Sequence, residues 1–102
     1  MTLIEKQCKF VLMVSMLIQW AHLQGYGITF GDAYATSGHI PNSFHYNRLA
    51  VDLNLFRDGK YLESTEDHAP LGHYWESLGG TWGGRWSDGN HYSYGEGRRY
   101  GT

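Results

Sequence analysis

A stretch of alternating apolar and polar residues near the middle of the chain predicts a β-strand. Every second residue is apolar and would share one face of the strand: Leu49, Val51, Leu53 and Leu55. The residues between them would share the other face: Arg48, Ala50, Asp52 and Asn54. Aspartate is disfavoured in strands, so Asp52, away from the apolar row, is either solvated or serves a function.

Histidines and acids are spaced around this strand in a way that suggests a metal site. His45 precedes Asp52 by seven residues, close enough to fold toward it at one end of a cleft. A second acid and histidine, Asp88 and His91, follow in the string D-G-N-H near the C-terminus. Two histidines with one or two carboxylates suit a zinc centre that keeps one coordination position for water.

Length and charge restrict the class of protein. A chain of 102 residues is expected to form one domain over residues 1–102, with an exposed or loosely docked tail at 95–102. The formal net charge of −2 gives no electrostatic reason to expect nucleic acid as a partner, because its binders carry a basic surface. A nuclease is therefore disfavoured.

The N-terminal region predicts a helix. Thr2 and Glu5 form a capping box, and Gly25 would stop the helix after Gln24. Apolar residues recur at helical spacing and would pack in the core: Phe10, Val14, Leu17 and Ala21, widened by Val11 and Ile18 and filled in by Met13, Met16 and Trp20.

The apolar run at 10–18 is interpreted as part of this buried helix. A signal-peptide core is the minority alternative, and the run is too short to span a bilayer. We therefore expect synthesis in the cytoplasm and no stable membrane insertion. Cys8 is the single cysteine, so no intrachain disulfide can form, and its place on this helix predicts an inert core thiol.

The remaining elements are shorter. Asp58-Gly59 predicts a hairpin turn after the central strand. Ser64 or Thr65 would cap a helix from about 67 to 78, in which Pro70 is tolerable only in the first turn. Further strands are expected at 28–30, 60–62, 81–86 and 91–94, with a surface loop at 33–42 and a turn at 87–90. These elements predict a single α+β domain with two helices on a mainly antiparallel sheet.

The strings S-F-H-Y-N-R-L-A-V-D, W-G-G-R-W and D-G-N-H-Y carry a family resemblance. Together they resemble the zinc peptidases of the D-Ala-D-Ala carboxypeptidase and L-alanyl-D-glutamate endopeptidase group, which includes many phage endolysins and shares its metal site with hedgehog-type folds. The signature of that group is Ser-x-His, six residues, Asp, and later an acid three residues before a second His. Its positions in this chain are Ser43, His45, Asp52, Asp88 and His91.

The resemblance implies roles for these residues. His45, Asp52 and His91 would bind Zn²⁺, and Asp88 would be the general base. Without the resemblance, Asp88 is more simply a turn former, because it precedes a glycine.

Four residues are candidates for substrate binding. An oxyanion or a substrate carboxylate could be held by Arg48, Arg85 or the Tyr46 hydroxyl, and the sequence does not choose among them. Ser43 would cap the turn or hydrogen-bond near a ligand.

One position departs from the family pattern. In many members an arginine that grips the substrate's carboxylate follows the tyrosine that corresponds to Tyr34, and here Ala35 follows it. The implied function is hydrolysis of a peptide bond in the peptidoglycan stem peptide, of the L-Ala-D-Glu or the D-Ala-D-Ala type, by a monomeric phage or prophage lysis enzyme. The alternative is a degenerate zinc-binding or cell-wall-binding virion protein.

Overall fold

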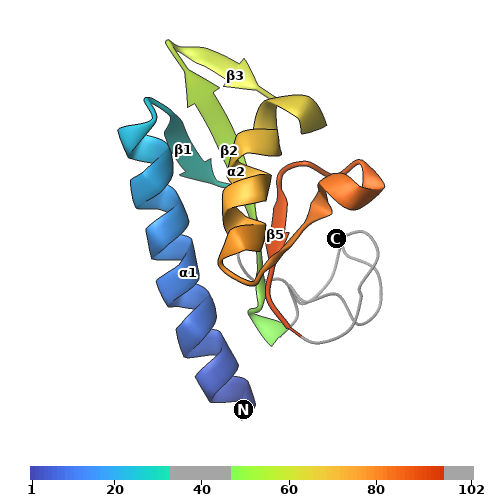
Figure 1. Ribbon diagram of the computed structural model, residues 1–102. Helices are drawn as coiled ribbons and strands as arrows, with labels where there is room; N and C mark the ends of the chain where they lie inside the picture. The colour runs from blue at the N-terminus through green and yellow to red at the C-terminus, as the bar shows by residue number, and fades with distance from the viewer. Residues whose placement is uncertain (33–46, 96–102) are drawn as a thin grey trace.

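The computed structural model describes residues 1–32 and 47–95, which form two helices and five strands. In chain order these are α1 (Leu3–Leu23), β1 (Gly27–Phe30), β2 (Ala50–Arg57), β3 (Lys60–Leu62), α2 (Thr65–Ser77), β4 (Thr81–Trp82), the 3-10 helix η2 (Gly83–Trp86) and β5 (His91–Ser93). Figure 1 shows α1 and α2 packed beside the strands. The predicted α+β class is confirmed.

The sheet is built around β2. Its order is β1-β2-β5-β4, with β3 also paired to β2, and every pair is antiparallel. The predicted alternation is confirmed from Val51 onward, because Val51, Leu53 and Leu55 are at most 1% exposed while Asp52 and Asn54 are half-buried; Leu49 is also buried but lies before the strand. The predicted hairpin is also confirmed, since Asp58 and Gly59 both adopt the positive φ angles that its turn requires.

Helix α1 begins and ends where the sequence predicts. The Thr2 amide donates to Glu5 Oε1 at 2.9 Å and the Glu5 amide donates to Thr2 Oγ1 at 3.1 Å, which completes the capping box. The core stripe is also confirmed, because its members are buried: Phe10, Met13, Val14, Leu17 and Ala21.

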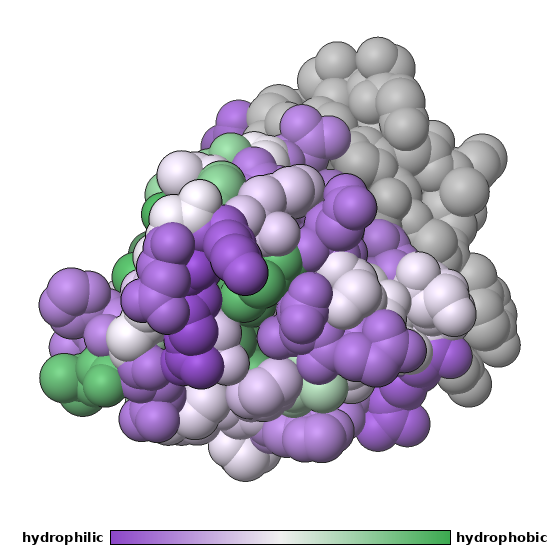
Figure 2. All heavy atoms as spheres, turned by 90° about the horizontal axis from the view of Figure 1, so that it is seen from above, coloured by the Kyte–Doolittle hydropathy of each residue, from purple (hydrophilic) through white to green (hydrophobic). Residues whose placement is uncertain are grey.

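The predicted burial of the rest of α1 is partly wrong. Val11 is 66% exposed, Met16 is 39% exposed, and Cys8 is exposed rather than a core thiol. The physical reason is that only one side of α1 faces the sheet and α2, and these residues lie outside that stripe. Seen from above, the exposed hydrophobic side chains form small patches between hydrophilic ones (Figure 2).

Helix α2 starts two residues earlier than predicted. Ser64 is the N-cap and accepts a hydrogen bond from the Asp67 amide at 3.0 Å. Pro70 is therefore the sixth helical residue, and its expected place in the first turn was wrong. Pro70 has no N–H to donate to the Glu66 carbonyl, and both residues are exposed, so that water can serve as the donor instead.

The predicted strand at 81–86 is also wrong beyond Trp82. The chain turns into η2 after Trp82, where Gly84 leaves room for the Trp82 indole to fold against the backbone. A Cβ on Gly84 would lie 2.3 Å from that ring, and a Cβ on Gly72 of α2 would lie 2.1 Å from it. The indole therefore sits between two glycines, and its Nε1 donates to the Gly89 carbonyl at 2.7 Å.

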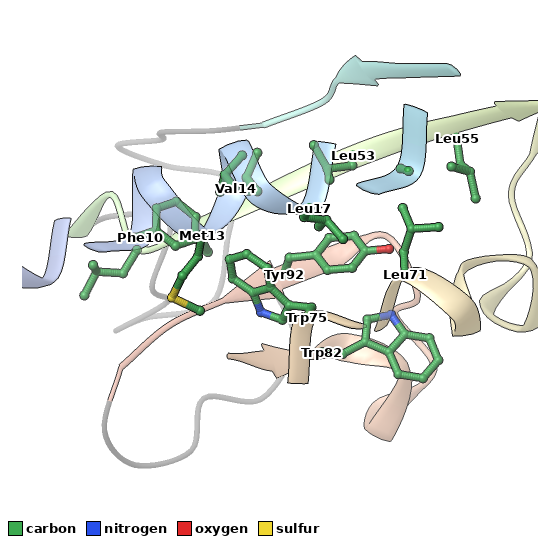
Figure 3. Close-up of a cluster of buried hydrophobic side chains, with 14 residues drawn as sticks. Phe10, Met13, Val14, Leu17, Leu53, Leu55, Leu71, Trp75, Trp82 and Tyr92 are labelled. Atoms are coloured by element: carbon green, nitrogen blue, oxygen red, sulfur yellow. The ribbon is translucent and has the colours of Figure 1, made fainter. Parts of the chain in front are cut away.

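The hydrophobic core lies between the helices and one face of the sheet (Figure 3). Trp75 is fully buried, and its indole meets Phe10 and Tyr92 edge-on with ring centroids 5.8 and 6.0 Å apart. Its Nε1 donates to the Ser93 carbonyl at 2.9 Å, so the one polar atom of this ring is satisfied. These contacts hold α1, α2 and β5 against one another.

The packing of Trp82 predicts whether one glycine substitution stabilises or destabilises the fold. Gly72→Ala would gain about 1 kcal/mol of helix propensity, but the new methyl would collide with the indole, a clash that typically costs about 1–3 kcal/mol. We expect net destabilisation in urea unfolding. Gly27→Ala is the matched control, because its Cβ would lie 3.7 Å from the nearest atom. A stabilised Gly72→Ala variant would refute this packing.

Candidate metal centre

Asp52 and His91 lie directly opposite each other on paired strands. Residues opposite one another in an antiparallel pair project from the same face of the sheet, and the register joins Asp52 of β2 to His91 of β5. The His91 Nδ1 to Asp52 Oδ1 distance is 3.7 Å. The His91 side chain is 1% exposed and that of Asp52 is 15% exposed. Strand pairing thus joins the two halves of the predicted site.

This pair fits the donor set of a zinc ion. Zn–N and Zn–O bonds of about 2.0–2.2 Å at a tetrahedral angle put the two donor atoms about 3.4 Å apart, close to the observed separation. The predicted third ligand, His45, lies outside the described residues. Within residues 1–32 and 47–95, no group of three histidine, cysteine or acidic side chains is placed to hold a metal.

Asp88 is positioned by the turn that leads into β5. Its amide donates to the Gly83 carbonyl at 2.9 Å, and its carbonyl accepts from the His91 amide at 3.1 Å. A Cβ on Gly83 would lie 2.2 Å from the Asp88 carbonyl oxygen and 2.7 Å from His91 Cβ. Gly83 is therefore a site residue that sequence reasoning missed, and the signal for it was the glycine pair in W-G-G-R-W.

Trp86 reaches the site from the end of η2. Its ring centroid lies 5.7 Å from that of His91, with the planes tilted by 54°. Trp82, by contrast, is 8% exposed and belongs to the core. Of the two tryptophans in W-G-G-R-W, Trp86 thus lies beside the site, and Trp82 packs in the hydrophobic core.

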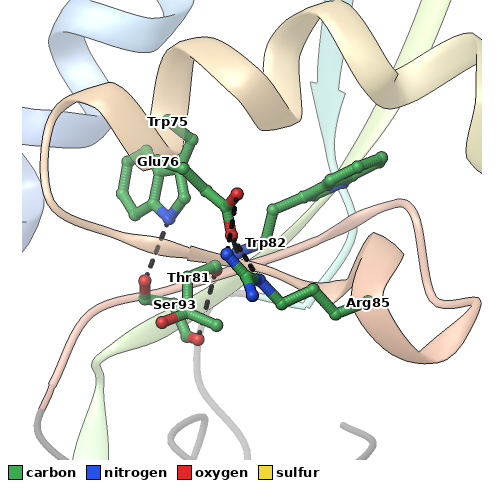
Figure 4. Close-up of polar contacts among 6 residues, drawn as sticks. All are labelled: Trp75, Glu76, Thr81, Trp82, Arg85 and Ser93. Carbon is green, nitrogen blue, oxygen red and sulfur yellow. Dashed lines mark hydrogen bonds and ion pairs between the residues drawn. The ribbon is translucent and has the colours of Figure 1, made fainter.

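Arg85 is engaged by a carboxylate of α2 (Figure 4). Its Nε and Nη2 donate to Glu76 at 2.9 and 3.3 Å, and the Trp82 amide donates to the same carboxylate at 3.3 Å. Partial burial raises the pKa of Glu76, but these hydrogen bonds outweigh it and hold the pKa below its ordinary value. Sequence reasoning missed Glu76, which connects α2 to η2.

Arg48 lies before the strand rather than in it. Its φ is 59°, and β2 begins at Ala50, so its predicted place on the face of Asp52 was wrong. It lines a shallow hollow beside α1 with Ile4, Gln7, Cys8 and Val11. The remaining candidates, Ser43, Tyr46 and the Tyr34-Ala35 pair, lie outside the described residues. The substrate-binding roles therefore stay predictions.

Comparison with known proteins identifies the family. Residues 36–94 match the D-alanyl-D-alanine carboxypeptidase family, and this match covers more than half of the chain. The chain belongs to this family of peptidoglycan-related peptidases, which confirms the resemblance carried by its motifs. No curated protein matches it. In the described part of the chain, no helix is long and apolar enough to cross a membrane.

A buried histidine behind the site was also missed. His68 of α2 is 1% exposed, and its Nδ1 lies 2.8 Å from the hydroxyl of Tyr92, the residue after His91. Burial lowers the pKa of His68, although a hydrogen bond to the backbone of Leu62 opposes this effect, and burial raises the pKa of Tyr92. The sequence carries no signal for this burial, because a single polar residue in a helix has no periodic pattern that marks it as buried.

The lowered pKa of His68 predicts that acid destabilises the fold. The unfolded chain binds a proton near the ordinary histidine pKa of about 6.5, while the folded chain resists protonation. The stability that depends on a neutral His68 is thus fully present above that pH and is lost as the pH falls below it. We expect urea midpoints of the metal-free protein to fall from about pH 7 to about pH 5.

Three variants test whether His68 causes this acid sensitivity. His68→Gln should flatten the dependence, whereas His22→Gln, which changes an exposed histidine of α1, should keep it. If His68→Gln does not fold, Tyr92→Phe is the alternative variant. It leaves the His68 imidazole buried and should therefore retain the dependence of the urea midpoint on pH. An equal slope in His68→Gln and the wild type would contradict the assignment.

Proposed function

We propose that this chain is a zinc-dependent peptidase that hydrolyses a peptide bond in the peptidoglycan stem peptide. The observation that carries the proposal is the strand register that joins Asp52 to His91, with Asp88 held three residues before that histidine. The family assignment supplies the reaction class. The bond would be of the L-Ala-D-Glu or the D-Ala-D-Ala type.

The metal would be held by His45, Asp52 and His91. Two neutral imidazoles and one carboxylate leave the ion a net positive charge and one open position. Bound zinc supplies Lewis-acid polarisation of a carbonyl and lowers the pKa of water. The near-complete burial of His91 would restrict the access of bulk water to this donor.

Asp88 would act as the general base. Its carboxylate would take the proton from the attacking water and pass it to the amine that leaves, because peptide hydrolysis requires both transfers. The turn from Gly83 to His91 holds its backbone on both sides. This rigidity would keep the short aspartate side chain in place.

Arg48, Arg85 or Tyr46 would bind the substrate's carboxylate. Ser43, two residues before the proposed ligand His45, would hydrogen-bond near the ligand. Arg85 already donates two hydrogen bonds to Glu76, so a substrate carboxylate would compete with that residue. Arg48 lies beside α1.

The proposed biological role is cell-wall lysis by a phage or prophage. The protein would be made in the cytoplasm of the host cell and would act as a monomer after release to the wall. Ala35, which follows Tyr34 where many family members have an arginine, favours a second candidate. That candidate is a degenerate protein that binds zinc or wall peptides without cutting them.

Elemental analysis of purified protein tests the metal site. We expect one zinc per chain in the wild type and its loss in His45→Ala and Asp52→Ala, because each variant removes one of three protein ligands. His73→Ala is the control, since His73 is an exposed residue of α2, and it should retain the zinc. A wild-type protein without zinc after supplementation would refute the peptidase.

Replacing the general base separates the two candidates. Asp88→Asn should retain zinc but lose about 10²–10⁴-fold in the turnover of purified peptidoglycan, the usual contribution of general acid–base catalysis. Mass analysis of the released fragments would identify the bond. A degenerate binding protein would show no turnover in the wild type, and full activity in Asp88→Asn would exclude the assigned role.

A further inference from the structure

The face of the sheet that carries Asp52 also carries other side chains of β2. Leu53 and Leu55 of β2 point into the core under the helices, so the residues that alternate with them point the other way. These are Asp52, Asn54 and Phe56, all less buried than their neighbours. The face of the sheet that carries Asp52 and His91 therefore continues along β2 beyond the site.

The neighbouring strands extend this line on both sides. Thr29 of β1 is opposite Asn54, and Tyr61 of β3 is opposite Phe56, so all four share one face. Thr29 and Tyr61 are exposed, while Asn54 and Phe56 are half-buried. None of these side chains is charged. The polar pair, Asn54 and Thr29, thus lies nearer to Asp52, and the aromatic pair, Phe56 and Tyr61, lies farther from it.

The aromatic pair forms a ledge at the hairpin end of the sheet. The Phe56 and Tyr61 rings lie 5.3 Å apart with their planes tilted by 40°, and Tyr61 is 53% exposed. On the other side of Phe56, β1 contributes Gly27, which has no side chain. The rings are therefore not covered by a cross-strand side chain from β1.

We propose that Phe56 and Tyr61, with Asn54 and Thr29, form a subsite for an N-acetylated sugar of the glycan strand to which the stem peptide is attached. Exposed aromatic rings offer a flat apolar surface for the apolar face of a sugar ring. The Asn54 amide and the Thr29 hydroxyl each donate and accept hydrogen bonds, as sugar hydroxyls and N-acetyl groups require. An uncharged surface suits an uncharged ligand.

The spacing fits a ligand that reaches the metal site. Phe56 follows Asp52 by four strand residues, or about 13 Å along β2. An extended peptide of about four residues spans this distance. A sugar on the ledge would thus stay joined to a D-Ala-D-Ala bond at the site, which lies several residues along the stem peptide, whereas an L-Ala-D-Glu bond lies too near the sugar for this spacing. The identity of that peptide rests on the proposed function, whereas sugar binding by the ledge does not.

A purely structural role for the ring pair makes a different prediction. Cross-strand aromatic pairs stabilise hairpins, and a pair with this role alone would affect unfolding without affecting binding. Tyr61→Ala removes the ring, and Tyr61→Phe restores it. Phe30→Ala is the matched control, because Phe30 is 62% exposed in the same sheet but lies opposite Leu53, on the core face.

Direct binding tests the subsite without requiring catalysis. We expect a soluble N-acetylglucosamine tetramer, titrated into isotope-labelled protein, to shift the amide signals of Thr29, Asn54 and Tyr61 in a saturable manner. Tyr61→Ala should weaken binding about tenfold, equivalent to about 1.4 kcal/mol, whereas Tyr61→Phe and Phe30→Ala should bind as the wild type does. Absence of saturable binding, or equal binding by Tyr61→Ala, would overturn the proposal.

Activity assays separate failure of the subsite from failure of the proposed function. Wild-type kcat/KM should be higher for glycan-linked stem peptide than for free stem peptide, and Tyr61→Ala should reduce this ratio severalfold. Binding of the tetramer through Tyr61 without any peptidase activity would leave the subsite intact and refute the function. Cleavage with the same ratio in Tyr61→Ala would refute the subsite and leave the function intact.

Discussion

The antiparallel pairing of β2 with β5 is the interaction on which the site depends. It places an acid from the middle of the chain opposite a histidine from its C-terminal half, on the face away from the helices. The adjacent pair, Val51 and Tyr92, points into the core and is almost fully buried. The hydrophobic free energy that drives burial of Tyr92 therefore also fixes His91, because neighbours in a strand cannot shift register independently.

Two indole rings determine how the chain reaches that pairing. Trp75 and Trp82 lie against glycines, and each donates its ring N–H to a backbone carbonyl of the segment that ends in β5. The closeness of Gly83 to Asp88 extends this packing to the proposed general base. A small domain with few strand residues thus uses rigid aromatic side chains where a larger one would use more sheet.

Much of this arrangement could be predicted, and the failures have physical causes. The strand alternation around Leu53, the capping box at Thr2 and the Asp58-Gly59 turn are local signals, so the sequence alone identified them. The turn after Trp82 and the burial of His68 depend on contacts with distant segments, which local patterns do not encode. The family resemblance of the motifs indicated the candidate site, whereas the pairing that places Asp52 opposite His91 is a long-range contact.

The exposure of Cys8 gives the molecule a natural attachment point. This thiol is the single cysteine of the chain and lies on α1, which packs on the face of the sheet opposite Asp52 and His91. A thiol-reactive fluorophore or spin label would therefore attach at one defined position on a long helix without any substitution. Such a probe would report distances to a paramagnetic ion or a labelled glycan from a fixed reference behind the sheet.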